Sequence, residues 1–178
     1  MFKILIGVIV VTIAVIVTFI AIDPNISGGT SSAGSATEVA KTFTVAVEGE
    51  VYKTGNFTLN EGATMSDLIT AAGGVTVNAD SRAYYAEAEL SKGMTYYIAS
   101  KYDSGDVCNM SEVNKVNINI DDATTLATVS GITSTIANSI VSYRSEKGTF
   151  STLEQIMEVY GVGNATYRKI RNYVILHA

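Results

Sequence analysis

One long apolar run opens the chain. Residues 4–22 are nineteen residues without a charge, and the run ends at Asp23-Pro24. A helix of that length spans about 28 Å, close to the thickness of the hydrocarbon core of a bilayer. We therefore predict a transmembrane anchor over residues 1–22, with a cleaved signal peptide as the alternative. Because Lys3 and the N-terminal amine are the only positive flank, the rest of the chain is expected outside the cytoplasm.

The stretch that follows changes from small polar residues to alternating patterns. Residues 23–42 are rich in Gly, Ser and Thr, which is typical of a flexible linker. Residues 43–100 then predict a small α+β domain. Helical spacing over residues 60–74 ends at Gly73-Gly74, which predicts one helix. Four strands are predicted from alternation and turn signals, in the segments FTVAVEGEV (43–51), GNFTL (55–59), SRAYY (81–85) and MTYYIAS (94–100).

Tyrosines and the cysteine of this region suggest little chemistry. Tyr84, Tyr85, Tyr96 and Tyr97 could stack on a sugar, but alternation along a strand buries half of them, so we expect core packing. Residues 101–114 form a polar connector that holds Cys108. A single cysteine cannot form an internal disulfide, and a tolerated loop residue is the expected role.

The C-terminal segment, residues 115–178, contains an internal repeat with an offset of thirty residues. Residues 126–143 align with residues 156–173, and the matched pairs are Leu126 with Ile156, Val129 with Val159, Gly131 with Gly161, Ile132 with Val162, Ile140 with Ile170 and Tyr143 with Tyr173. Each copy reads as helix, glycine turn, helix. The predicted helix starts are Asp121 or Asp122, Ser134, Ser151 with Glu154 as a capping box, and Asn164. Gly148 ends the second helix, and positions 167, 170 and 174 give the last helix its apolar face.

A glycine turn in front of a helix can bind an anion. The first amides of a helix have no intrahelical partner, and the helix dipole adds positive charge there. Glycine removes the side chain that would block close approach. Arg168 and Arg171 lie three residues apart on one side of the last helix, and Lys169 is expected to point elsewhere. Two such turns could hold two phosphates at a fixed spacing, although the same turns also serve simply to pack two helices closely.

Charge is distributed unevenly along the chain. The chain has a net charge of −5, with Lys and Arg numbering 12 and Asp and Glu 17. Residues 1–114 carry six cations and twelve anions, whereas residues 115–178 carry six cations and five anions, so the C-terminal segment is not acidic. Such an asymmetry is a weak indication of a polyanionic partner.

Two family resemblances follow from these motifs. Residues 43–100 resemble the SLBB module, which has a β-grasp fold, in the glycines and element order of VEGEVYKTGNFTLNEGATMSDLITAAGG. Residues 115–178 resemble the tandem helix-hairpin-helix domain of ComEA-type competence DNA receptors, through VNIN, IVSYR, TLEQI and GVG. The first turn departs from the family, because Thr133 stands where the family keeps a glycine.

The resemblance implies a membrane-anchored receptor that captures double-stranded DNA outside the cell during natural transformation, without reading sequence. The DNA would then pass to an uptake channel or pilus machinery. Together the turn chemistry and the resemblance predict a set of DNA-contacting residues: Gly131, Ile132, Thr133, Ser134, Gly161, Val162, Gly163, Asn164, Arg168, Arg171, Arg144 and Lys147.

Other functions stay open at this stage. The helix-hairpin-helix domain could contact protein, which would make the chain a surface scaffold, and the SLBB-like domain could bind a glycan or a protein. An enzyme is not expected, since no catalytic or metal-binding motif is present and no cofactor is implied. His177, the only histidine, is expected to belong to a frayed terminus.

Overall fold

The computed structural model describes residues 41–102 and 111–178. The predicted anchor (1–22), nearly all of the predicted linker, and Cys108 lie outside the described residues. Within the described ranges, no helix has both the length and the apolarity needed to cross a membrane.

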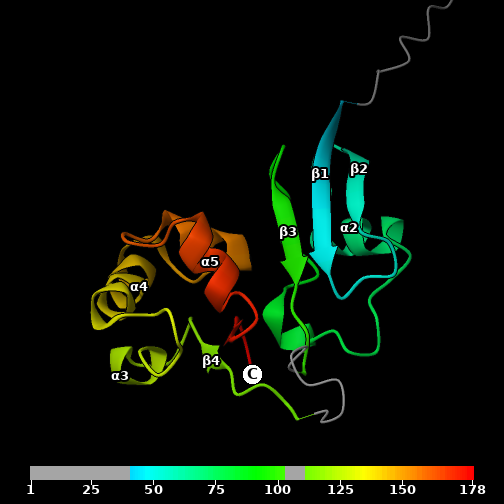
Figure 1. Ribbon diagram of the computed structural model, residues 1–178. Helices are drawn as coiled ribbons and strands as arrows, with labels where there is room; N and C mark the ends of the chain where they lie inside the picture. The colour runs from blue at the N-terminus through cyan, green and yellow to red at the C-terminus, as the bar shows by residue number, and fades with distance from the viewer. Residues whose placement is uncertain (1–40, 103–110) are drawn as a thin grey trace, which may run out of the picture. The chain divides into compact units, whose positions relative to one another are not determined.

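A three-stranded sheet and one helix form the β-grasp part (Figure 1). The strand order is β2-β1-β3, with β1 antiparallel to β2 and parallel to β3. The helix α2 buries Met65 and Leu68 in one core with the sheet residues Val45, Val47 and Ile98. The bounds are β1 Thr42–Gly49, β2 Gly55–Asn60, α2 Met65–Ala71 and β3 Thr95–Ile98, so these three predicted strands and the helix are confirmed.

The predicted strand at residues 81–85 is wrong. Ser81–Ala83 form a short 3-10 helix, η1, because the Asp80 carboxylate accepts a hydrogen bond from the Arg82 amide at 3.1 Å and closes a turn. Of the four tyrosines considered for sugar stacking, Tyr96 is buried in the core, and Tyr84, Tyr85 and Tyr97 are partly buried.

Four short helices carry the repeat, and a two-stranded parallel sheet closes it. Val116 pairs with Val174 and Asn117 with Ile175. The last helix therefore ends before Val174, contrary to the prediction, and Val174 packs from a strand instead. The bounds are β4 Val116–Asn117, α3 Ala123–Leu126, α4 Ser134–Lys147, η2 Leu153–Glu158, α5 Asn164–Ile170 and β5 Val174–Ile175. The third helix, η2, has 3-10 rather than α geometry.

Caps explain where these helices begin and end. Asp122 caps α3 by accepting from the Thr125 amide at 2.7 Å, as predicted, and Gly148 ends α4 with a φ of 94°. The predicted capping box of Ser151 and Glu154 is wrong. The box lies one residue later, between Thr152 and Gln155, which leaves the Glu154 side chain free for another role.

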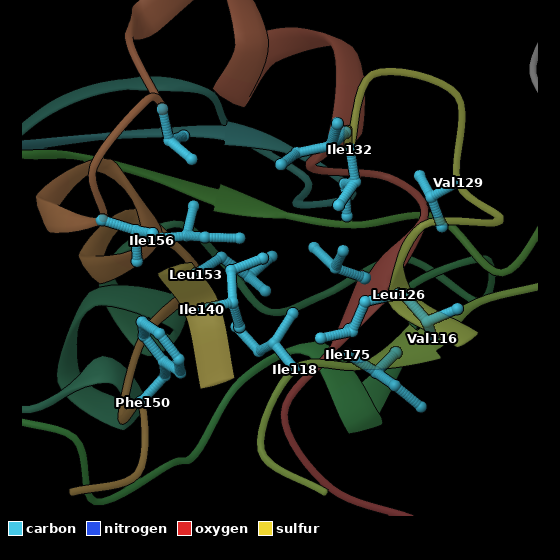
Figure 2. Packing of buried hydrophobic residues seen from close by; sticks show 14 of the residues in the cluster. Val116, Ile118, Leu126, Val129, Ile132, Ile140, Phe150, Leu153, Ile156 and Ile175 are labelled. Atoms are coloured by element: carbon cyan, nitrogen blue, oxygen red, sulfur yellow. The ribbon is translucent and has the colours of Figure 1, made fainter. Parts of the chain in front are cut away.

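Matched positions of the two copies meet in one core. Both members of four aligned apolar pairs are buried, and Figure 2 shows much of this cluster. Because each copy supplies half of the apolar surface, neither could bury its own face alone. The pairs are Leu126 with Ile156, Val129 with Val159, Ile132 with Val162, and Ile140 with Ile170.

The β-grasp part and the helical part belong to one compact unit. The helical core includes Ala83 and Ala99 from the β-grasp part. A buried ion pair also joins them, with Lys115 Nζ 3.0 Å from Asp80 Oδ2. Burial alone would raise the pKa of Asp80, but hydrogen bonds from Arg82 and Lys115 outweigh it and lower the pKa to about 2.

The C-terminus is docked, so the prediction that His177 lies in a frayed end is wrong. The His177 ring stacks on Tyr85 with 4.7 Å between ring centroids, and its Nε2 lies 3.1 Å from the Tyr84 carbonyl oxygen. The Leu176 amide donates to the Arg82 carbonyl at 2.8 Å.

Candidate nucleic-acid interface

The first turn joins α3 to α4, and one of its residues caps the start of α4. Gly131 adopts a φ of 112°, and the Ile132 amide donates to the Val129 carbonyl at 2.9 Å. The N-cap of α4 is Thr133 rather than the predicted Ser134. Its hydroxyl oxygen accepts from the Ile136 amide at 3.3 Å, so the residue that departs from the family pattern acts as an internal cap.

The second turn, between η2 and α5, has the same backbone but no cap. Gly161 adopts a φ of 89°, and the Val162 amide donates to the Val159 carbonyl at 3.0 Å. The N-cap of α5 is Gly163, one residue before the predicted Asn164, and no side chain of the described ranges caps this end. The repeat aligns Gly163 with Thr133, so the two turns differ at the residue that decides whether the helix start is capped.

The two turn glycines are required by packing as well as by φ. A Cβ on Gly131 would lie 3.0 Å from Ile170 Cγ2, and one on Gly161 would lie 3.2 Å from Ile136 Cγ1. Each turn therefore packs closely on a helix of the other copy. Gly163 differs, because a Cβ there would meet nothing within 4 Å.

Several amides at the second turn are available to an outside acceptor. Among the residues that the structure describes, no acceptor is found for the amides of Gly163, Asn164 and Ala165. All three residues are exposed. At the first turn Thr133 and Ser134 are also exposed, and their amides likewise have no acceptor within the described part of the chain. The arrangement can bind an anion through main-chain N–H groups.

The predicted cations have different surroundings. Arg168 and Lys147 are exposed. Arg144 donates to the Ile118 carbonyl at 2.9 Å, so its guanidinium is partly engaged within the fold. Arg171 is held by Glu48, with 2.9 Å between Arg171 Nη1 and Glu48 Oε2, and its guanidinium lies 3.7 Å from the centroid of the Tyr97 ring. Arg168 is therefore more accessible than Arg171, which directly follows α5 as its C-cap.

Sequence reasoning missed Lys169, which was expected to point away from the turns. Its Cδ lies 3.1 Å from the position of a Cβ on Gly131, so this α5 side chain runs beside the first turn. The residue is exposed. No sequence signal identifies this placement, because it depends on how the two copies pack together.

Glu154 fixes the second copy to the β-grasp sheet. Its Oε1 accepts from the Tyr97 amide of β3 at 2.8 Å and from the Tyr167 hydroxyl of α5 at 2.7 Å. Burial raises the pKa of Glu154, while these hydrogen bonds lower it. Burial, together with the nearby Glu154 carboxylate, also raises the pKa of Tyr167. Within the described ranges, no group of His, Cys, Asp and Glu side chains could hold a metal ion.

Fold and turns together define a β-grasp module followed by a tandem helix-hairpin-helix domain. The SLBB domain family matches residues 44–98, and the helix-hairpin-helix motif family matches residues 111–175. ComE operon protein 1 of Bacillus subtilis is 30% identical over 146 residues, which cover 77% of this chain and 71% of that protein. The chain belongs to the ComEA-type competence DNA receptor family.

A second relative matches a shorter segment. It is an uncharacterized protein of Haemophilus influenzae that is 40% identical over 63 residues, which cover 35% of this chain and 56% of that protein.

Proposed function

We propose that this protein is a membrane-anchored receptor that captures double-stranded DNA outside the cell, without reading its sequence, and passes it to the DNA-uptake machinery. The observation that carries the proposal is the uncapped second turn. The exposed amides from Gly163 to Ala165 find no acceptor among the residues that the structure describes, and Arg168 follows on the same helix. Family membership adds to this, because the family consists of DNA receptors for competence.

The binding step uses main-chain donors first and side-chain cations second. A phosphate oxygen accepts hydrogen bonds from the amides at the start of α5, and the helix dipole adds a favourable charge interaction. Arg168 extends the contact along the same strand. At the first turn the Thr133 hydroxyl, which uses its oxygen as the cap, retains its hydrogen to donate, and Lys169 lies beside it. Contacts of this kind position the duplex without specifying sequence.

Anchoring rests on the sequence alone. Residues 4–22 are apolar over a length that fits a bilayer, and Lys3 lies on the N-terminal side. We place both C-terminal parts outside the cell, where DNA would first be met. Hand-over to an uptake channel is part of the same proposal, through its family role.

The proposal is tested by DNA affinity as a function of salt. The full chain in mild detergent is titrated onto a fluorescent duplex of random sequence, and anisotropy is read at several salt concentrations. With three or four phosphates neutralised, log K should fall against log salt with a slope of about −3. A chain that binds duplexes with no salt dependence, or does not bind them at all, would contradict the proposal and favour a scaffold that contacts protein.

A pair of variants shows whether binding is at the turns. Arg168→Gln with Lys169→Gln should reduce the steepness of the slope by about two, because two ionic contacts are lost. The matched control replaces two cations of the β-grasp part, Lys41 and Lys53, with Gln and should leave the slope unchanged. Equal effects of the two pairs would indicate that only total charge matters.

A further inference from the structure

We propose that Tyr160 is a separate, non-ionic contact to DNA, whose ring packs on a deoxyribose next to the phosphate held by the second turn. This inference rests on the proposed function. Tyr160 directly precedes Gly161 and is 82% exposed. Its neighbours Val159 and Val162 are 3% and 5% exposed, and a hydrogen bond of 3.0 Å between them fixes the turn. The ring is therefore held outward by a rigid loop.

The repeat itself excludes a role for the ring in folding. The aligned residue of the first turn is Ser130, which is also exposed. The first turn nevertheless makes the matching hydrogen bond, from the Ile132 amide to the Val129 carbonyl at 2.9 Å. A serine thus suffices to build this turn. Exposing an aromatic ring at the same place costs solvation of apolar surface, which a bound partner would recover.

A groove beside Tyr160 fits the sugar side of a nucleic-acid backbone. It has a volume of about 530 Å³ and lies between Tyr160 and α4. The α4 wall presents the small polar side chains of Thr135, Asn138 and Ser142 near the start and middle of the helix, and larger side chains, including Tyr143 and Lys147, nearer its end. Thr135 lies at the N-terminal end of α4, the helix that follows the first glycine turn. The groove therefore extends from the second glycine turn toward the start of α4.

The charges that line the groove determine which part of the DNA sugar–phosphate backbone can enter it. Glu146, Glu158 and Lys147 line it, and Glu158 Oε2 accepts from the Tyr143 hydroxyl at 2.9 Å. With two carboxylates and one ammonium group, the charged lining is negative on balance and disfavours a phosphate inside the groove. The deoxyribose carries no charge and offers an apolar face to the Tyr160 ring, while the adjoining phosphate lies outside the groove at the amides of Gly163 and Asn164.

The test separates ionic from non-ionic loss. Full-length Tyr160→Ala and Tyr160→Phe are titrated onto a random duplex over a salt series, with Tyr52→Ala as the matched control, since Tyr52 is also exposed, at 66%. Tyr160→Ala should weaken binding roughly fivefold at every salt concentration, because apolar contact area is lost, and should leave the salt slope unchanged. Tyr160→Phe should stay within about twofold of the unaltered chain, since the ring remains.

Two results would overturn the inference, and they are distinguishable from failure of the proposed function. If Tyr160→Ala binds as well as the unaltered chain, or no worse than Tyr52→Ala, then Tyr160 does not contact DNA, although the proposed DNA binding still holds. A flatter salt slope in Tyr160→Ala would make its loss ionic and would also overturn the inference. If the unaltered chain fails to bind duplex DNA, the proposed function fails, and this inference fails with it.

Discussion

The two copies of the helix-hairpin-helix repeat share their cores but differ in what they present outward. Their aligned apolar residues are buried in both copies. Exposed pairs differ in chemistry, and these are Ser130 with Tyr160, Thr133 with Gly163, and Asn138 with Arg168. Thr124 and Glu154 differ even in burial, because Thr124 is exposed and Glu154 is buried. Inward positions are constrained by shared packing, whereas outward positions are free to diverge. We infer that two glycine turns with matching hydrogen bonds have different tasks.

The copies also differ in how they are attached to the β-grasp part. The second copy is held by buried Glu154 and by the pair between Arg171 and Glu48. The first copy is held by the buried pair of Lys115 and Asp80 just before β4. The second turn therefore lies on the copy that has more contacts to the β-grasp part. These contacts hold α5 in place, so the amides at its start do not need a cap from the protein. We expect the second turn to carry most of the affinity for DNA.

The largest expected effect is on stability, when the attachment of the second copy is removed. Glu154→Ala should lower the free energy of unfolding by about 3 kcal/mol, because the Tyr97 amide and the Tyr167 hydroxyl lose their acceptor. The aligned change Thr124→Ala should cost less than about 0.5 kcal/mol, since Thr124 is exposed. Urea unfolding followed by circular dichroism measures both, and similar losses would remove the distinction between the copies.

Next comes the contrast between the two glycines of the second turn. Gly161→Ala should destabilise the protein by about 2 kcal/mol, because its φ of 89° is unfavourable for alanine and its Cβ would press on Ile136. Gly163→Ala should stay within about 0.5 kcal/mol of the unaltered chain, since the space around it is open. Thermal unfolding gives both values. Equal destabilisation would show that Gly163 is also needed for packing.

A smaller effect is expected from giving the first copy the cation of the second. Asn138 is exposed and aligned with Arg168. Asn138→Arg should strengthen duplex binding by about fivefold at 0.1 M salt and steepen the salt slope by about one. The control is Asn56→Arg in β2, which adds the same charge elsewhere. An identical gain from the control would mean that net charge, not position, sets affinity.

Much of the fold follows from the sequence, because hydrophobic spacing and glycine turns are local signals. The repeat, strands β1, β2 and β3 and the turn glycines are found in this way, whereas the two-residue strands β4 and β5 are not. The starts of α4, η2 and α5 are each missed by one residue. At α4, for example, Thr133 and Ser134 are both good N-caps and only backbone geometry distinguishes them. The role of Glu154 is hidden because its partners, Tyr97 and Tyr167, come from other elements.

Site cations are harder to predict than site glycines. Spacing along α5 suggested Arg168 and Arg171 as a pair, but it carries no information about Glu48, which lies 123 residues earlier and binds Arg171. The same limit hid Lys169 beside Gly131, since packing between the copies places it there. Long flexible side chains take their partners from tertiary structure, whereas a glycine turn is defined by its own backbone.

Exchanging the cap residues of the two turns tests most directly whether the uncapped turn holds the phosphate. Gly163→Thr gives the second turn the cap residue of the first. The φ of −99° at Gly163 and the open space around it allow a threonine there. Thr133→Gly removes the cap residue from the first turn. Duplex affinity of the full chain is measured at one low salt concentration. We predict roughly fivefold weaker binding for Gly163→Thr, because the new hydroxyl would take the Thr166 amide, which is aligned with the capped Ile136 amide, away from the phosphate. Thr133→Gly should bind equally well or more tightly. Unchanged affinity in Gly163→Thr, with loss in Thr133→Gly, would contradict this prediction.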